Sequence, residues 1–348
     1  MLIKMKIAKN FIGKNQQVFI IAEAGVNHNG KLALAKKLVD AAKKAGADAV
    51  KFQTFKAENL VIKNVKITNY QKRNLGKNET QLAMLEKLEL QYGDFVKLKK
   101  YCDKKKIIFL SAPHSPDAID FLEPLVPAFK VGSGDLTNLP FLEKIAQKKK
   151  PIILSTGMAT LKEVKEAVRV IKRKGNKRII LLHCTTNYPC PLPEVNLRSM
   201  LTLKKEFNLP VGYSDHTQGN IVPMMAALIG ASVIEKHFTL DKNLPGPDHK
   251  ASLDPAEFKE MVKVIRIAQT VLGSGSKKPT KSEEEIKKVI RKSIVASRDI
   301  NKGEKISESM LSIKRPGTGI EPKYFNKIID RKARQNIKKD ELISWKKI

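Results

Sequence analysis

Two histidines follow short apolar runs in similar sequence contexts. His216 ends the stretch VGYSDH and His237 ends VIEKH, although the whole chain has only six histidines. Because side chains alternate between the faces of a strand, Ser214 shares a face with His216, and Glu235 shares one with His237. A single histidine is usually structural, but two at neighbouring strand ends favour a two-histidine metal site with positions open to water and substrate oxygen.

Two lysines and two hydroxyl-glycine turns indicate an anion site. Lys51 and Lys130 lie within predicted strands, where an unpaired ammonium is costly to bury. Anion binding explains both, although snorkelling to the surface is the alternative for Lys51. In KVGSGD, Ser133 and two glycines let backbone N–H groups approach phosphate or carboxylate oxygens. The turn STGM begins at Ser155, and its alternative role is a helix cap.

Other polar residues allow more than one interpretation. Glu23 ends the first predicted strand and has two interpretations of nearly equal weight. It forms a salt bridge to a buried lysine, or it holds a sugar hydroxyl or moves a proton. His28, in the turn NHNG, is predicted to cap the following helix, and His114 and His249 are not assigned as ligands. Cys184 is interpreted as a small core residue because no activating partner is evident.

The elements that must position these residues are apolar runs alternating with amphipathic helical stretches. Most runs are apolar throughout, as in a parallel sheet covered on both faces. Eight such units predict an α/β fold, a (β/α)8 TIM barrel, rather than an open doubly wound sheet, with the site at the C-terminal strand ends. The runs cover residues 18–23, 49–53, 107–111, 128–133, 151–155, 179–184, 209–214 and 233–237.

Composition shifts predict the domain organisation. We expect a barrel domain over residues 1–272, a linker over 273–290 that begins with Gly and Ser, and a small mostly-β domain over 291–348. The connection over roughly residues 54–100 exceeds the usual loop length, which indicates a lid or a substrate-binding insertion.

The chain is strongly basic, with 66 Lys and Arg against 35 Asp and Glu, a formal charge of +31. The lysines are spread over nearly every predicted helix and aromatic residues are sparse, which favours a solvated surface over a nucleic-acid site. Three cysteines without a CxxC pair are expected to be reduced thiols. The apolar stretch at residues 18–22 is too short for a signal peptide or a membrane span, so we expect a soluble cytoplasmic protein.

A series of motifs, in this order, resembles the N-acetylneuraminate (sialic acid) synthase family. They are IAEAGVNHNG, VKFQTFKA, KVGSGDLTNLP, ILSTGMAT, LLHCTTNYP, GYSDHT, IEKHFTLDK and GPDHKASL. The tail, with RKSIVASRDINKGE and KRPGTGI, resembles that family's antifreeze-like (SAF) domain. The resemblance covers nearly the whole chain.

The resemblance implies condensation of phosphoenolpyruvate with the open-chain aldehyde of an N-acylated hexosamine, N-acetylmannosamine. Carbon–oxygen cleavage would release phosphate and form a nine-carbon 2-keto sugar acid. His216 and His237 would hold a divalent metal, commonly Mn²⁺ with Mg²⁺ or Co²⁺ as alternatives, that polarises the aldehyde oxygen.

The resemblance also implies roles for further residues. Glu23 and Asp135 would be the catalytic carboxylates, with Glu23 near the reacting carbon. Phosphoenolpyruvate would be bound by Lys51, Lys130, Ser133 and Ser155. The sugar would be bound by Gln53, Tyr188, Asp248 and, from the partner subunit of a domain-swapped homodimer, Arg315.

Three departures from the family pattern leave the acceptor open. Ala112 stands where relatives commonly have a hydroxyl, Asp135 where many have Glu, and Asn187 where close relatives often have Glu. The main alternative is an N,N′-diacetyllegionaminate synthase using a 2,4-diacetamido-2,4,6-trideoxymannose, whereas GPDHKASL looks unlike the pseudaminate branch. A 3-deoxy-octulosonate-type synthase would share the barrel but would not need the small domain. A catalytically inactive binding module would not retain both histidines and both lysines. A basic nucleic-acid-binding protein is the alternative from another class.

Overall fold

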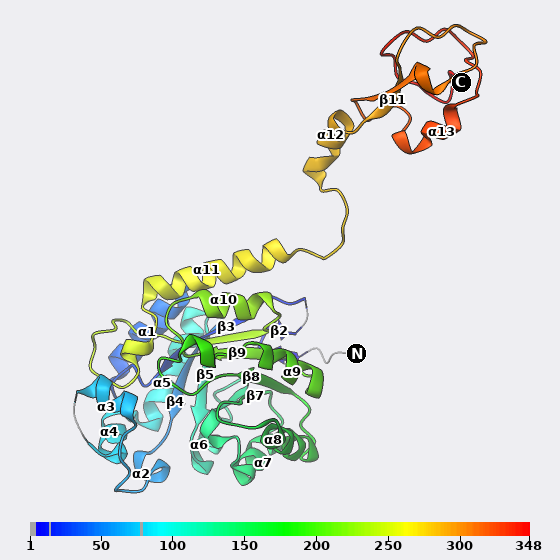
Figure 1. Cartoon of the computed structure of the whole chain (residues 1–348). Coiled ribbons are helices and arrows are strands. Elements are labelled where there is room, and N and C mark those ends of the chain that lie inside the picture. The colour runs from blue at the N-terminus through cyan, green and yellow to red at the C-terminus, as the bar shows by residue number, and fades with distance from the viewer. Residues whose placement is uncertain (1–4, 14, 77–78) are drawn as a thin grey trace. The chain divides into compact units, whose positions relative to one another are not determined.

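The chain forms two compact units, residues 1–273 and 274–348. A computed structural model describes residues 5–13, 15–76 and 79–348 (Figure 1). Within these residues, no helix is both long and apolar enough to cross a membrane.

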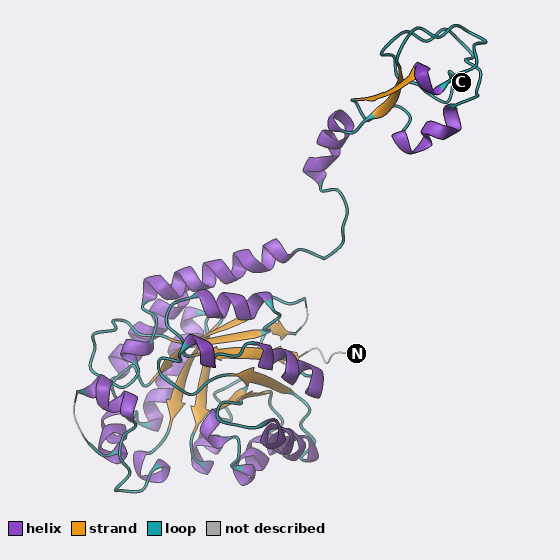
Figure 2. Ribbon diagram, in the orientation of Figure 1, coloured by secondary structure: helices purple, strands orange, loops and turns teal. Residues whose placement is uncertain are grey.

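Eight parallel strands form the sheet of the first unit (Figure 2). Their order is β5-β4-β3-β10-β9-β8-β7-β6, and the end strands β5 and β6 lie beside each other, so the sheet curls into a nearly closed barrel. The predicted (β/α)8 barrel is therefore confirmed. The strands are β3 (Phe19–Gly25), β4 (Ala49–Thr54), β5 (Ile108–Pro113), β6 (Phe129–Val131), β7 (Ile152–Ser155), β8 (Ile179–His183), β9 (Val211–Asp215) and β10 (Val233–His237).

A helix follows each strand on the outside of the barrel, and local sequence signals set several of the helix ends. A capping box of Thr160 and Glu163 begins α8, and a second one of Asp254 and Glu257 begins α11. Gly46, at φ 89°, ends α1 in the left-handed region that glycine adopts without strain. The helices are α1 (Leu32–Ala45), α5 (Tyr92–Lys105), α6 (Pro116–Leu122), α7 (Leu139–Gln147), α8 (Leu161–Arg173), α9 (Arg198–Phe207), α10 (Ile221–Leu228) and α11 (Pro255–Leu272).

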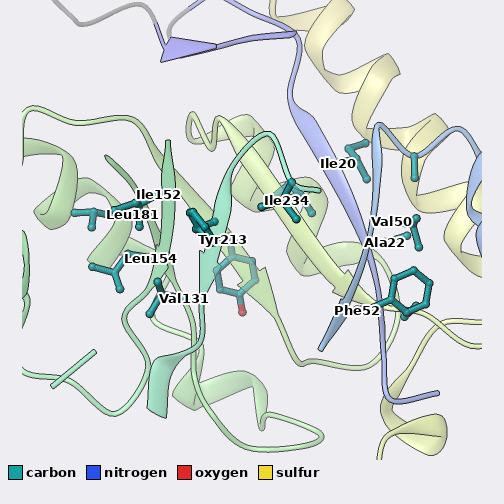
Figure 3. Packing of buried hydrophobic residues seen from close by; sticks show 14 of the residues in the cluster. Ile20, Ala22, Val50, Phe52, Val131, Ile152, Leu154, Leu181, Tyr213 and Ile234 are labelled. Atoms are coloured by element: carbon teal, nitrogen blue, oxygen red, sulfur yellow. The ribbon is translucent and has the colours of Figure 1, made fainter. Parts of the chain in front are cut away.

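Alternate residues of the strands pack outward against these helices. Figure 3 shows Ile20 and Ala22 of β3 in this layer, together with Val50 and Phe52 of β4. Burying a side chain of this size stabilises the fold by about 1.5–3 kcal/mol relative to leaving it exposed. The intervening positions therefore face the barrel interior, where the site residues lie.

The interior is apolar toward the amino-terminal strand ends. Phe19, Ile21 and Val233 belong to a fully buried cluster there, and the β1–β2 hairpin adds side chains to it. This hairpin, β1 (Met5–Ile7) and β2 (Asn10–Ile12), contributes Met5, Ile7 and Ile12 and was not predicted, because strands of three residues are too short to show a period. The polar site residues of the barrel interior thus lie at the carboxyl-terminal strand ends.

The long connection after β4 is helical. It contains α2 (Ala57–Leu60), α3 (Asn69–Leu75) and α4 (Gln81–Leu88), while residues 77–78 of the predicted insertion lie outside the described residues. Phe55, Ile67, Met84 and Leu88 form a small core of their own with Val26. The segment is therefore a folded insertion beside the barrel.

The second unit is small and built around one antiparallel strand pair. β11 (Ser293–Ala296) pairs with β12 (Leu311–Lys314), preceded by α12 (Lys281–Ile290) and followed by α13 (Phe325–Ile328). Its core is a separate cluster that includes Ile294, Ile306 and Ile343. The prediction of a small mostly-β domain after the barrel is confirmed by this antiparallel pair, although much of the unit is irregular.

Candidate active site

Strand register brings charged side chains together inside the carboxyl end of the barrel. Glu23 of β3 lies opposite both Lys51 of β4 and His237 of β10, and Glu235 of β10 lies opposite Ser214 of β9. All of these side chains are buried. Residues far apart in the chain therefore meet in one layer because parallel strands end at the same edge.

Two lysines and two glutamates form one network in this layer. Lys51 Nζ lies 2.6 Å from Glu23 Oε2 and 3.6 Å from Glu235 Oε2, and Lys130 Nζ lies 3.5 Å from Glu235 Oε1. Lys130 also donates a 2.8 Å hydrogen bond to Ser155 Oγ, and Ser214 Oγ donates one of 2.9 Å to Glu235. Of the lysine–carboxylate contacts in this network, only the one between Lys51 and Glu23 is short. Lys130 therefore has no close carboxylate partner among the described residues.

The pKa values show which members of the network are poorly satisfied. Burial lowers the pKa of Lys130, and Glu235 offsets this only in part. Burial alone would also lower the pKa of Lys51, but Glu23 and Glu235 raise it above its usual value. Burial raises the pKa of Glu23 despite Lys51 beside it, whereas the two lysines hold the pKa of Glu235 at about 2. An incoming anion would stabilise the charged form of Lys130 most.

The two predicted histidine ligands lie beside this network. Their ring centroids are 5.5 Å apart, and burial lowers both pKa values, that of His216 to about 4. His216 Nδ1 is 2.7 Å from the carbonyl oxygen of Thr185, which leaves its other ring nitrogen for a ligand, and His237 Nδ1 is buried without a hydrogen-bond partner. Neutral, oriented imidazoles with an unpartnered nitrogen fit a divalent cation.

The histidine pair has no third protein ligand in place. Within residues 5–13, 15–76 and 79–348, no three His, Cys, Asp or Glu side chains converge as a metal cluster. A cation held here by His216 and His237 would therefore keep positions open for substrate oxygens, as catalytic sites do.

An aromatic wall covers the histidine pair. The ring of Tyr188 lies 4.2 Å from that of His216 and 5.4 Å from that of His237, and Tyr70 of α3 contacts Tyr188 at 5.1 Å. Next to them, burial and the charge of Glu23 raise the pKa of Asp248 to about 7. The insertion thus contributes Tyr70 to the wall beside the histidine pair.

The two predicted hydroxyl-glycine turns meet in the opposite wall. The N–H of Gly157 donates to Ser133 Oγ at 3.1 Å, and Ser133 Oγ lies 3.1 Å from Cys184 Sγ. Burial raises the pKa of the Cys184 thiol, which agrees with an inert small residue. A side chain at Gly157 would collide with this wall, since its Cβ would lie 2.3 Å from Thr186 Oγ1.

The remaining predicted residues are placed as follows. Gln53 Nε2 donates to Glu23 Oε1 at 3.2 Å, and Asp135 Oδ2 lies 3.5 Å from His114 Nδ1 at the rim. Arg315 is exposed and belongs to the second unit, in the segment after β12. Every other predicted site residue lies at the carboxyl end of the barrel.

Some outcomes differ from the sequence analysis. The prediction that His28 caps a helix was wrong: its Nδ1 accepts from the N–H of Gly30 within its own turn, and α1 begins at Leu32. Glu235 was not among the predicted site residues, although its strand parity with His237 was visible. His114 could not be assigned because its partner follows a different strand.

The fold and this site define a barrel enzyme with a buried lysine pair and a histidine pair at the carboxyl strand ends. The chain belongs to the NeuB family, whose model matches residues 38–277, and a SAF domain matches residues 291–348. It is therefore an enzyme of the sugar acid synthase class, a transferase.

Individual relatives cover nearly the whole chain. The N,N′-diacetyllegionaminic acid synthase of Legionella pneumophila is 50% identical over 341 residues, covering 97% of this chain and 96% of its own. The enzyme of the same name from Campylobacter jejuni is 50% identical over 331 residues, covering 94% and 99%. The solved N-acetylneuraminic acid synthetase of Leptospira borgpetersenii in complex with citrate has a TM-score of 0.72 and 34% identity, covering 82% of this chain and 95% of its own.

Proposed function

We propose that this enzyme condenses phosphoenolpyruvate with the aldehyde of an N-acylated hexosamine to give a nine-carbon 2-keto sugar acid and phosphate. The observation that carries the proposal is the buried group of Lys51, Lys130, Glu23 and Glu235 directly beside His216 and His237. One region provides cations for a trianionic substrate, and its neighbour provides ligands for a carbonyl-polarising metal.

Phosphoenolpyruvate would bind on the lysine side. Its carboxylate and phosphate would replace the long contacts of Lys51 and Lys130 to Glu235, at 3.6 and 3.5 Å. Ser133, Ser155 and the N–H of Gly157 supply donors for the remaining oxygens. Binding would therefore cost little of the existing network, because the short Lys51–Glu23 pair can remain.

The sugar aldehyde would bind on the histidine side. Mn²⁺, or Mg²⁺ or Co²⁺, held by His216 and His237 would supply Lewis-acid chemistry there. Tyr188, Asp248 and Gln53 would orient the sugar, and the buried aromatic wall would exclude bulk water. C3 of phosphoenolpyruvate then forms a bond to the aldehyde carbon.

Glu23 is the group best placed to exchange the proton of this step. Burial raises its pKa above the ordinary value despite the short contact to Lys51, which makes it a carboxyl better suited to hold and release a proton than an exposed one. Glu23 lies between Lys51 and Gln53, at the boundary of the two substrate sides. We therefore assign it proton donation to the aldehyde oxygen as that oxygen becomes a hydroxyl.

For the acceptor, we favour a 2,4-diacetamido-2,4,6-trideoxymannose over N-acetylmannosamine. The two relatives named for N,N′-diacetyllegionaminic acid are each 50% identical to this chain, against 34% for the N-acetylneuraminic acid synthetase. N-acetylmannosamine, which the motifs suggested first, stays the second candidate.

The proposal extends to the second unit. Arg315 would reach the N-acyl group of the sugar in the barrel of a partner subunit, in a cytoplasmic, domain-swapped homodimer. Mixing Arg315→Ala with His216→Ala chains tests this, because shared sites should restore part of the activity. No recovery in confirmed mixed dimers would contradict the arrangement.

Phosphate release and product mass test the function. Phosphoenolpyruvate is incubated with Mn²⁺ and either sugar or none, with and without chelator. We expect sugar-dependent, chelator-sensitive release, faster with the diacetamido sugar, and a nine-carbon 2-keto acid by mass spectrometry. Absence of release from folded protein would overturn the proposal, whereas salt-sensitive nucleic-acid binding indifferent to chelator would support the other class.

A further inference from the structure

A histidine and a carboxylate bridge the place where the barrel closes. β5 and β6 are the two ends of the strand order, and they lie side by side. His114 directly follows β5, and Asp135 ends a short 3-10 turn, Ser133–Asp135, that follows β6. Their Nδ1 and Oδ2 atoms are 3.5 Å apart, and each side chain is less than one-fifth exposed.

Strand parity places His114 on the inner side of the barrel. Leu110 and Ala112 of β5 are aligned with Lys51 and Gln53 of β4, and Leu110 belongs to the cluster inside the barrel. Because alternate residues share a face, His114 points to the same interior at the mouth. Its Nε2 is buried and has no hydrogen-bond partner among the described residues.

The pair lies across the mouth from His216 and His237. Around the barrel, β3 and β4 separate β10 from β5 on one side, while β8 and β7 separate β9 from β6 on the other. The inner charged groups between them are the lysines Lys51 and Lys130 with their carboxylate partners Glu23 and Glu235. A phosphoenolpyruvate held by these lysines would thus have its aldehyde partner on one flank and His114 on the other.

We propose that His114, oriented by Asp135, takes up the proton of the water that adds to C2 of phosphoenolpyruvate, an inference that rests on the proposed function. When C3 bonds to the aldehyde carbon, C2 becomes electron-poor. A lone pair of water forms the new C2–O bond, and the water proton moves to the unpartnered Nε2 of His114, while Asp135 stabilises the resulting imidazolium.

The step balances without another reactant. The C2–O bond to phosphate then breaks, its electron pair leaves with the phosphate, and the proton of the C2 hydroxyl goes with it as the ketone forms. The proton on His114 replaces, through solvent, the one that Glu23 gave to the aldehyde oxygen. One water, one phosphoenolpyruvate and one aldehyde are consumed per sugar acid and phosphate.

Steady-state kinetics of His114→Ala and Asp135→Asn test the role. We expect kcat of His114→Ala to fall about 10²- to 10⁴-fold, with KM for phosphoenolpyruvate changed by less than a factor of about three. Added imidazole should restore part of kcat. Asp135→Asn should lower kcat less, because the proton acceptor remains.

Two controls keep the test sharp. His114→Gln preserves a polar side chain of similar size but takes up no proton, so it should be as slow as His114→Ala. His183→Ala is the matched histidine control: His183 Nε2 contacts the carbonyl oxygen of Val195, away from the site, so imidazole should restore nothing. Thermal melts verify that each variant is folded.

Several results would overturn the inference. Normal kcat in His114→Ala or His114→Gln would do so, as would loss confined to KM for phosphoenolpyruvate, which marks an anion ligand, or lack of imidazole rescue in folded His114→Ala. Wild-type protein is assayed in parallel, which separates the two possible failures. If the wild type releases no phosphate, the proposed function fails. If the wild type is active and the variant is equally active, only this inference fails.

Discussion

Two buried groups of lysines and carboxylates lie on opposite faces of the barrel sheet and meet at β10, which carries Glu235 on the inner face and Lys236 on the outer one. Inside the barrel, Lys51 and Lys130 share Glu23 and Glu235 with contacts up to 3.6 Å. Outside it, the neighbouring Lys236 is bonded to the carboxylate of Asp215 and the carbonyl oxygen of Thr217. Both groups are excluded from water, yet only the outer one is saturated.

The difference shows how one strand serves two purposes. Asp215 Oδ1 also accepts hydrogen bonds from the N–H and the hydroxyl of Thr217, at 3.0 and 2.9 Å. The polar atoms of the outer pair are therefore already hydrogen-bonded within the protein. Burial lowers the pKa of both Lys130 and the outer Lys236, so the difference lies in the contacts: those of the inner network to Glu235 are 3.5 and 3.6 Å long. We infer that the outer pair stabilises the fold and that the inner one is kept ready to exchange a carboxylate for a substrate anion.

The largest effect is expected from breaking the outer pair. Lys236→Met should lower the free energy of unfolding by about 3–5 kcal/mol, because Asp215 would stay buried without a counter-charge. Urea denaturation measures this, and Lys236→Met combined with Asp215→Asn should recover part of the loss. A loss below about 1 kcal/mol would contradict the structural role.

Removing an inner lysine should have the opposite pattern. Lys130→Met should reduce kcat/KM for phosphoenolpyruvate by about 10²- to 10³-fold, as for other lost electrostatic contacts to substrate. Its stability should be unchanged or higher, because Lys130 has only a long contact to Glu235, and Glu235 keeps Lys51 and Ser214 as partners. Phosphate-release kinetics and urea melts are compared, and a clear fall in stability would remove the distinction between the two groups.

Asp248 is an inner carboxyl whose pKa is raised to about 7 by burial and by Glu23. The folded state then holds a proton that the unfolded state releases near pH 4, so stability falls as pH rises through this window. Asp248→Asn should remove this slope and gain about 2 kcal/mol over wild type between pH 5 and 7. Urea denaturation of both proteins across this pH range measures the effect. If the free energy of unfolding depends on pH in the same way in both, Asp248 does not cause the slope.

The smallest effect tests how tightly the inner wall is packed. Gly157→Ala should reduce activity about tenfold, equivalent to about 1.4 kcal/mol, because the new Cβ would lie 2.3–2.9 Å from Thr186, Ser133 and Cys184. Gly93→Ala is the matched control, since Gly93 lies in α5 on the outside of the barrel and no atom of the described residues lies within 4 Å of its Cβ position. Equal activity of both variants would argue against a rigid wall.

Much of the site was predictable because strand periodicity is local. The apolar runs and the period of two already placed Lys51 with Gln53 and Glu235 with His237. The hairpin carrying Met5 and Ile7 was missed because its strands are only three residues long. His28 was misassigned because a turn and a helix cap use the same acceptor over the same few residues.

The sequence by itself determined the eight strands, their inner and outer faces and the family. Only the tertiary structure decided which residues meet across strands: Lys236 with Asp215, Tyr70 with Tyr188, and His114 with Asp135 at the barrel closure. The physical reason is that alternation is encoded in neighbouring residues, whereas a contact between distant ones exists only once the sheet has closed.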